Sequence, residues 1–123
     1  LTPVLRNVDK KNIEDLVDEY GDLIKRARSG GLKEKDFVGG TFTITNLGML
    51  DVDFFTPIIN PPQIAILGIN RMKDNVILEN GVPKNVKTMY LSLSFDHRAI
   101  DGAPAARFLQ RIKQYFEESN QVE

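Results

Sequence analysis

The sequence predicts an α+β fold, with helices on one face of a mixed or largely antiparallel sheet. Three observations support this class. Apolar residues recur at helical spacing near both ends of the chain, apolar or β-branched runs of strand length lie between them, and turn signals rich in Gly, Pro and Asn separate these runs. Helices that flank strands joined by hairpin-like connections are typical of α+β folds.

The first predicted helix runs roughly from Lys11 to Ser29. Asp9 can cap its N-terminus, and the pair Gly30-Gly31 is a natural stop. Its apolar residues recur with a period of about 3.6, which predicts one packing face made of Ile13, Leu16, Val17, Tyr20, Leu23, Ile24 and Ala27.

Four segments between the helices read as strands. The first, Thr41 to Asn46, is β-branched and alternating, and the apolar run Ile64 to Ile69 follows a proline-rich turn. The last two, Val76 to Glu79 and Lys87 to Phe95, are separated by the turn signal Asn80-Gly81. In the last strand one face is expected to carry Met89, Leu91, Leu93 and Phe95.

A second helix is predicted to begin near Ala103-Pro104, with the proline in its first turn. The two apolar helix faces and the strand runs leave little spare polar surface, so we expect another chain or segment to complete part of the sheet. No internal domain boundary is evident in the sequence.

The apolar face of the second predicted helix carries Ala105, Phe108, Leu109, Ile112, Tyr115 and Phe116.

The composition excludes several classes of protein. At 123 residues, 41% hydrophobic and 27% charged, the chain resembles one ordinary globular domain. A formal net charge of -1 gives no strong field for nucleic acid or an anionic membrane. Without cysteine there is no disulfide or thiol nucleophile, and a single histidine excludes a multi-histidine metal site. No apolar run is long enough to cross a bilayer.

The only histidine, His97, is the first candidate for catalysis. It follows an apolar strand pattern and precedes a helix, a position from which imidazole can act as a general base. Asp96 and Asp101 are the nearby groups that could hold its ring. The alternative is a histidine that merely ends a strand, with Asp101 as the cap of the last helix. The two roles can coexist.

Three ordered segments resemble motifs of the dihydrolipoyl acyltransferases, the core components of 2-oxo acid dehydrogenase complexes. The segment from Ser94 to Ala103 is similar to their His-x-x-x-Asp-Gly signature and, more distantly, to that of chloramphenicol acetyltransferase. Gly39 to Gly48 resembles the Gly-Gly-x-Phe-Thr-Ile-Ser/Thr-Asn-x-Gly motif, and Thr56 to Gly68 resembles a second block of the family. Residues 1–123 would then form the C-terminal portion of the catalytic domain.

The resemblance implies a role for each candidate residue. His97 would remove the proton from the thiol of coenzyme A or dihydrolipoamide, and Thr45 would donate a hydrogen bond to the tetrahedral oxyanion. From the residues alone, Thr45 is an ordinary strand threonine. Asp101 would support the geometry around His97. The other assignments are a structural ion pair for Arg98 and a pantetheine channel lined by Asn46 and Asn70.

The resemblance also implies an assembly. The fold would be the two-layer sandwich of chloramphenicol acetyltransferase, with a mixed sheet, of which this chain supplies roughly half. A homotrimer, with His97 and Thr45 from different chains, would be the building block of a larger core that meets decarboxylase and dihydrolipoyl dehydrogenase components. The polar end from Glu117 to Glu123 differs from the apolar docking segment of many members and argues against a large cage.

The expected cofactors are coenzyme A as a substrate and a lipoyl group on a separate or missing domain, with no metal. The expected location is the cytoplasm, or the mitochondrial matrix in a eukaryote, with no nucleic-acid or membrane partner. Two alternatives stay open: a chloramphenicol-type acetyltransferase, which modifies a hydroxyl, and a catalytically silent core protein. Among members of the family, Leu47-Gly48-Met49 looks less like the succinyl type, and the acetyl and branched-chain types share these motifs.

Overall fold

The computed structural model describes residues 2–119. These residues fall into two compact units with the junction between Thr41 and Phe42, a division that the sequence pattern did not reveal. Each unit is described by itself below. Residues 120–123, the end of the polar tail, lie outside the described part of the chain.

The first unit is built around helix α1, Ile13–Arg28. The prediction of Asp9 as its cap is wrong, because Asp9 lies in a short 3-10 helix, Val8–Lys10, that precedes α1. Asn12 takes this role, and its side chain accepts the N–H of Asp15 at 2.8 Å. The predicted stop is confirmed: Gly30 has a φ of 74°, the left-handed conformation that glycine adopts easily.

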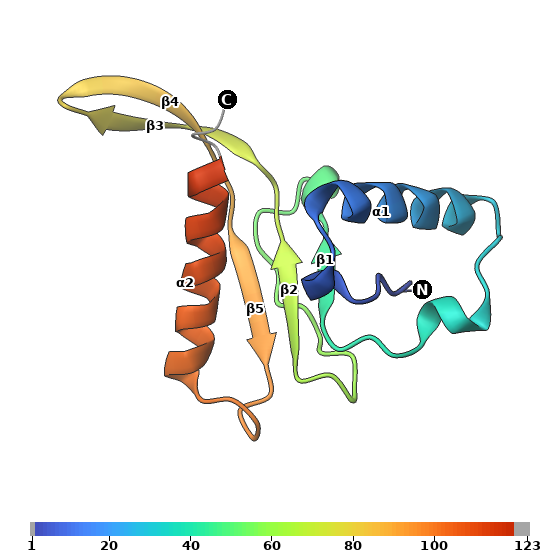
Figure 1. Cartoon of the computed structure of the whole chain (residues 1–123). Helices are drawn as coiled ribbons and strands as arrows, with labels where there is room; N and C mark the ends of the chain where they lie inside the picture. Colours follow the sequence, from blue (N-terminus) through green and yellow to red (C-terminus); the bar gives the residue numbers. More distant parts are fainter. Residues whose placement is uncertain (1, 120–123) are drawn as a thin grey trace. The chain divides into compact units, whose positions relative to one another are not determined.

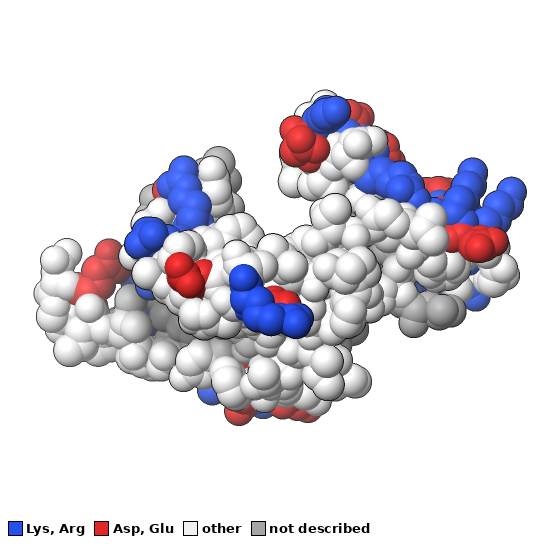
Figure 2. Space-filling model, turned by 90° about the horizontal axis from the view of Figure 1, so that it is seen from below, with Lys and Arg blue, Asp and Glu red and all other residues white. Residues whose placement is uncertain are grey.

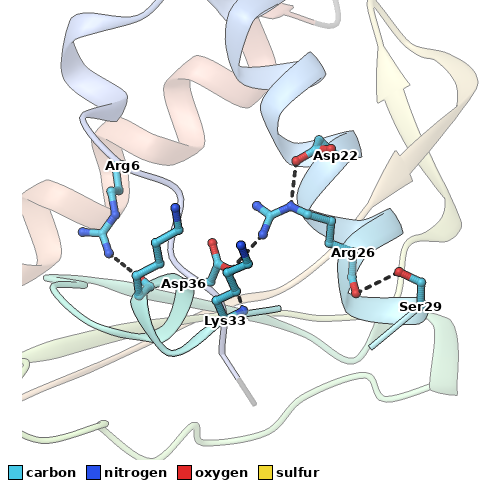
Figure 3. Close-up of polar contacts among 7 residues, drawn as sticks. Arg6, Asp22, Arg26, Ser29, Lys33 and Asp36 are labelled. Carbon is cyan, nitrogen blue, oxygen red and sulfur yellow. Dashed lines mark hydrogen bonds and ion pairs between the residues drawn. The ribbon is translucent and has the colours of Figure 1, made fainter. Parts of the chain in front are cut away.

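A charged network ties α1 to the second short 3-10 helix, Glu34–Phe37 (Figure 3). The Arg26 guanidinium donates to the carboxylates of Asp22 and Asp36, each at 2.8 Å. The backbone N–H of Lys33 also donates to Asp36, and these two donors, Lys33 first, hold the pKa of Asp36 below its usual value. The network fixes the loop that returns from the helix.

The predicted apolar face of α1 is only partly covered within this unit. Leu23 is buried, whereas Ile13, Val17 and Tyr20 are exposed. Much of the predicted packing face of α1 is therefore left open within this unit.

The second unit contains a three-stranded mixed sheet in the order β1-β2-β5 (Figure 1). Its strands are β1, Thr43–Asn46, β2, Ala65–Ile69, and β5, Leu91–Phe95. β1 runs parallel to β2, and β5 runs antiparallel to it. The central strand β2 is buried from Ala65 to Gly68, in keeping with its apolar sequence.

A two-stranded hairpin extends away from this sheet (Figure 1). It consists of β3, Lys73–Glu79, and β4, Val82–Thr88, joined at Asn80-Gly81. Asn80 and Gly81 have φ values of 53° and 78°, which fit the hairpin turn that this dipeptide favours.

The predicted single strand from Lys87 to Phe95 is wrong, because it is two strands that change partner. Thr88 pairs with Lys73 in the hairpin, whereas Leu91 pairs with Ile69 in the three-stranded sheet. The two residues between them leave both ladders. The Asn80-Gly81 turn therefore joins β3 to β4 and does not lead directly into the strand that ends at His97.

Helix α2, Gly102–Ser119, runs beside β5 (Figure 1). As predicted, Pro104 lies in its first turn. Ala105 is buried, and the ring of Phe108 meets that of Phe42 edge to face, with centroids 5.9 Å apart.

The surface seen in Figure 2 carries basic and acidic side chains side by side, with uncharged surface between them. This distribution accords with the formal net charge of -1. Within residues 2–119, no helix is both long and apolar enough to span a bilayer.

Candidate active site

His97 stands in the tight turn between β5 and α2. The last pair of the strand is Phe95 with Ala65, and the N–H of Asp96 then donates to the carbonyl of Ile64 at 2.8 Å. The Asp96 carbonyl accepts the N–H groups of Ala99 and Ile100, which closes the turn. His97 is exposed at this turn, at the strand-to-helix position that the sequence predicts.

The carboxylate of Asp96 is bound to Arg98. The guanidinium donates to both carboxylate oxygens, at 2.7 Å from one nitrogen and 3.0 Å from the other, and the Arg98 backbone N–H adds a third donor at 3.0 Å. The side-chain donors first, and then the backbone donor, lower the pKa of Asp96 to about 2. The expected ion pair of Arg98 is present, and its partner is one of the two carboxylates considered for His97.

Asp101, the other carboxylate, is exposed just before α2, and its backbone carbonyl accepts the N–H of Ala105 at 3.2 Å. Between residues 2 and 119, no hydrogen bond joins the His97 ring to Asp96 or Asp101. Its nearest aromatic neighbour is Phe95, with ring centroids 5.9 Å apart. The imidazole is therefore available to a ligand.

His97 opens onto a pocket of about 420 Å³. One wall comes from the segment before β2 and the other from the end of β5 and the turn after it. The lining residues are Ile59, Pro61, Pro62, Gln63, Phe95, Asp96, His97 and Arg98. We call this region the β5 end. The pocket therefore places an exposed imidazole, which can act as a general base, beside both apolar and polar side chains.

The other predicted site residues gather at the opposite end of the sheet, which we call the β1 end. Thr45 pairs with Gly68, and the side chain of Asn46 accepts the N–H of Gly48 at 2.9 Å. A Cβ on Gly48 would stand 2.8 Å from the carbonyl oxygen of Asn70, so only glycine fits there. The fold thus brings Thr45, Asn46 and Asn70 into one neighbourhood.

Asn70 is buried, with 2% of its surface exposed. Its amide nitrogen donates to the Tyr90 carbonyl at 2.8 Å and to the Ser92 hydroxyl at 3.3 Å. These bonds hold the end of β2 against the start of β5. Its Oδ1 has no partner among the described residues and is the one side-chain atom left for a water or a ligand.

The register of the sheet separates His97 from Thr45 within one chain. Thr45 lies level with Gly68 and Ser92, whereas His97 follows Phe95. Three residues of strand, about 10 Å, separate Ser92 from Phe95 before the chain reaches His97. One chain therefore holds the predicted base and the predicted hydroxyl at different ends of its sheet.

Two further polar residues at the β5 end escaped the sequence reasoning. The buried Thr43 hydroxyl donates to the side-chain oxygen of Gln63 at 2.6 Å, and Gln63 lines the His97 pocket. Two features of the sequence could have indicated them. Thr43 shares a strand face with Thr45, and Gln63 lies inside the Thr56 to Gly68 block.

Comparison with known proteins identifies the fold as that of an acyltransferase catalytic domain. The family described as 2-oxoacid dehydrogenases acyltransferase (catalytic domain) matches residues 1–123, and the chain belongs to this family. The resemblance stated from the sequence motifs and the predicted fold class are both confirmed.

Two relatives illustrate the range of the family. The chain is 44% identical to the dihydrolipoyllysine-residue acetyltransferase component of the pyruvate dehydrogenase complex of Rickettsia bellii (strain RML369-C), covering 95% of this chain and 28% of that protein. It is 43% identical to the succinyltransferase component of the 2-oxoglutarate dehydrogenase complex of Escherichia coli (strain K12), covering 99% of this chain and 30% of that protein.

Solved structures agree with this placement. Azotobacter vinelandii dihydrolipoamide acetyltransferase superposes with a TM-score of 0.82 at 40% identity, over 90% of this chain and 46% of that one. A truncated catalytic core of the 2-oxoacid dehydrogenase multienzyme complex from Thermoplasma acidophilum gives 0.83 at 40% identity, over 96% and 51%. The chain thus spans less than a third of these curated relatives and about half of these solved chains.

Proposed function

We propose that this chain is the C-terminal portion of an acyltransferase catalytic domain that moves an acyl group between dihydrolipoamide and coenzyme A. The observation that carries the proposal is His97, an exposed imidazole that lines a pocket with both apolar and polar walls, in a chain of this family. The lipoyl group would arrive on a separate or missing domain of a 2-oxo acid dehydrogenase complex.

The spacing of the site residues supports the proposal. A crystallographic and enzymatic study of the Azotobacter vinelandii enzyme addresses the role of a serine, a histidine and an asparagine in its mechanism, where the serine precedes the histidine by 52 residues and the asparagine follows it by four. In this sequence Thr45 precedes His97 by the same number of residues as that serine, and Asp101 follows it by the same number as that asparagine. The residue types differ: here they are a threonine and an aspartate.

In the proposed reaction, His97 takes the proton from the acceptor thiol. The thiolate attacks the carbonyl carbon of the acyl thioester, and its electron pair forms the new C–S bond while the carbonyl oxygen gains negative charge. The Thr45 hydroxyl donates to that oxyanion. The intermediate then collapses, the old C–S bond breaks, and His97 returns its proton to the leaving thiolate. Asp101 supports the geometry of the turn that holds His97.

The separation of the two ends of the sheet supports a site shared between subunits. Because Thr45 lies away from His97 in one chain, we propose that His97 works with the Thr45 hydroxyl of a neighbouring chain in a homotrimer. That trimer would be the building block of a core that meets the decarboxylase and dihydrolipoyl dehydrogenase components.

The acyl group proposed from Leu47-Gly48-Met49 is acetyl or branched-chain. The overall identities of 44% to an acetyltransferase and 43% to a succinyltransferase do not separate these types. Initial rates with acetyl-, isobutyryl- and succinyl-coenzyme A would separate them.

The function is tested by acyl transfer from acetyl-coenzyme A in the longest natural polypeptide that contains this chain. We expect transfer to dihydrolipoamide and none to chloramphenicol, a hydroxyl acceptor. Transfer to the hydroxyl alone would favour a chloramphenicol-type enzyme, and transfer to neither would favour a silent core protein.

The shared site is tested by complementation. His97→Ala and Thr45→Ala chains, each expected to have strongly reduced activity alone, are mixed under conditions that allow subunits to exchange. We expect activity to reappear, because interfaces form that combine one intact His97 with one intact Thr45. If both residues acted within one chain, the mixture would stay inactive.

A further inference from the structure

We infer that Gln63 is a substrate-binding residue of the His97 pocket, where its side-chain N–H₂ donates a hydrogen bond to the amide carbonyl of a thiol-bearing arm. The inference rests on the proposed function, because that function supplies the arm.

The first step is that Gln63 is held in place. Its side-chain oxygen accepts the Thr43 hydroxyl at 2.6 Å, and its backbone N–H donates to the Asn60 carbonyl at 3.0 Å. Thr43 is buried, with 7% of its surface exposed, and a buried hydroxyl without a partner would be costly. The Thr43 hydroxyl therefore fixes the oxygen side of the amide.

The second step is that the nitrogen side of the amide is free. Within residues 2–119, the side-chain nitrogen of Gln63 has no hydrogen-bond partner, and the buried side-chain atoms without a partner are confined to Asn70 and Arg71. The nitrogen is therefore open to solvent on a residue that lines the pocket. An amide nitrogen offers two donors and no acceptor, so its ligand must supply an acceptor oxygen.

The third step concerns the kind of acceptor. The charges in the pocket wall, Asp96 and Arg98, neutralise each other in a two-pronged ion pair. An anionic ligand therefore gains little there, whereas the apolar wall of Ile59, Pro61, Pro62 and Phe95 suits a methylene chain. A neutral carbonyl on a flexible chain that ends in a thiol fits all three surfaces: the apolar wall, the Gln63 amide and the imidazole.

Two arms share this chemistry, the pantetheine end of coenzyme A and dihydrolipoamide, because both place an amide carbonyl along a thiol-bearing chain. Their carbonyls lie at different distances from the sulfur. Gln63 therefore distinguishes amide-bearing thiols from simple thiols. A comparison of how pantetheine and dihydrolipoamide bind shows which of the two arms occupies the pocket.

The test is binding to the chain, followed by nuclear magnetic resonance and therefore independent of turnover. Pantetheine, dihydrolipoamide and the amide-free propane-1,3-dithiol are titrated into the wild type, Gln63→Met, and the control Gln110→Met on the exposed surface of α2. We expect Gln63→Met to weaken binding of at least one amide-bearing arm about three- to tenfold, the loss of one hydrogen bond, and to leave propane-1,3-dithiol unchanged. Gln110→Met should match the wild type.

Equal weakening of all three thiols, or no change for either amide-bearing arm, would overturn the inference. If Gln63→Met failed to fold, the side-chain N–H₂ signal of Gln63 in the wild type would still decide, since it must shift on saturation with pantetheine or dihydrolipoamide and stay in place with propane-1,3-dithiol. A chain that binds as expected but transfers no acyl group would contradict the proposed function alone.

Discussion

The two ends of the three-stranded sheet carry similar polar residues, but these residues differ in burial and in hydrogen-bond partners. At the β1 end the amide nitrogen of the buried Asn70 donates to Tyr90 and Ser92, and the side-chain oxygen of Asn46 accepts the N–H of Gly48, so most of these polar groups bind the chain itself. At the β5 end His97 is exposed above an open pocket, and one side of Gln63 is free. A polar residue in a strand-end motif can therefore hold the backbone or await a ligand, and burial and partners distinguish the two.

The contrast is the structural basis of the proposal that a site forms between two chains. Thr45 lies at the β1 end, where the Gly48–Asn70 approach and the Asn46–Gly48 hydrogen bond brace the backbone, and such bracing would suit the proposed donor role of Thr45. His97 has no ion pair with Asp96, because that carboxylate is bound by Arg98. Under the proposal, each end would meet its counterpart on another chain.

Removal of the His97 imidazole is expected to have the largest effect. In the parent polypeptide His97→Ala should lower the rate of acyl transfer about two to four orders of magnitude, the usual range for a general base, with the fold unchanged because the side chain is exposed. Single-turnover kinetics and the circular dichroism spectrum measure both effects. A variant that kept more than about a tenth of the activity would show that this end of the sheet is not the catalytic one.

Thr45→Ala should have the next largest effect, a loss of about a hundredfold in kcat with little change in KM, because its hydroxyl matters chiefly once the oxyanion forms. Thr45→Ser keeps the hydroxyl and should be mild. Separate measurement of kcat and KM is the test. A change in KM alone would place Thr45 with the packing residues of the β1 end.

Local signals in the sequence predicted the elements well. The 3.6-residue period predicted α1 and α2, and the apolar run from Ile64 predicted β2. The errors came from residues whose partners lie far along the chain. Asn12 and Asp9 both have side chains suited to cap a helix. Asn12 caps α1 because Asp9 is part of the short 3-10 helix that precedes it. The break before Leu91 depends on a change of strand partner, which alternation alone cannot reveal.

The candidate site residues were predicted from sequence motifs, and a motif does not show how one strand pairs with another. They indicated His97, Thr45 and Asn70 but could not show that β5 runs antiparallel to β2 and so carries His97 away from Thr45. They also could not show that Asp96 turns toward Arg98, or that the Thr43 hydroxyl reaches Gln63. Each of these facts depends on long-range pairing or on the choice of a side-chain conformation.

Asn70→Ala is expected to test the structural side of the comparison. It removes two donated hydrogen bonds and leaves a buried gap, so it should lower the free energy of unfolding by about 1–3 kcal/mol. Asn46→Ala at the same end removes one exposed local bond and should cost about 0.5–1 kcal/mol. Urea denaturation measures both. An equal cost for the two variants would remove the distinction between a buried brace and a surface contact.

The smallest expected effect is a shift in the pKa of Asp96. Arg98→Met removes the guanidinium but keeps the backbone N–H, so the pKa should rise from about 2 toward, but not to, the ordinary value of 3.8. A lowered pKa in the folded state contributes stability above pH 3.8, and that contribution is lost as the pH falls toward 2. The variant should therefore lose less stability than the wild type as the pH falls from 3.8 toward 2.

Carbon-13 titration of the Asp96 carboxyl measures the pKa, with the exposed Arg107→Met as the control. A pKa that stayed near 2 in Arg98→Met would mean that the guanidinium is not what holds the carboxylate, and the contrast between the two ends would lose the ion pair on which the β5 side depends.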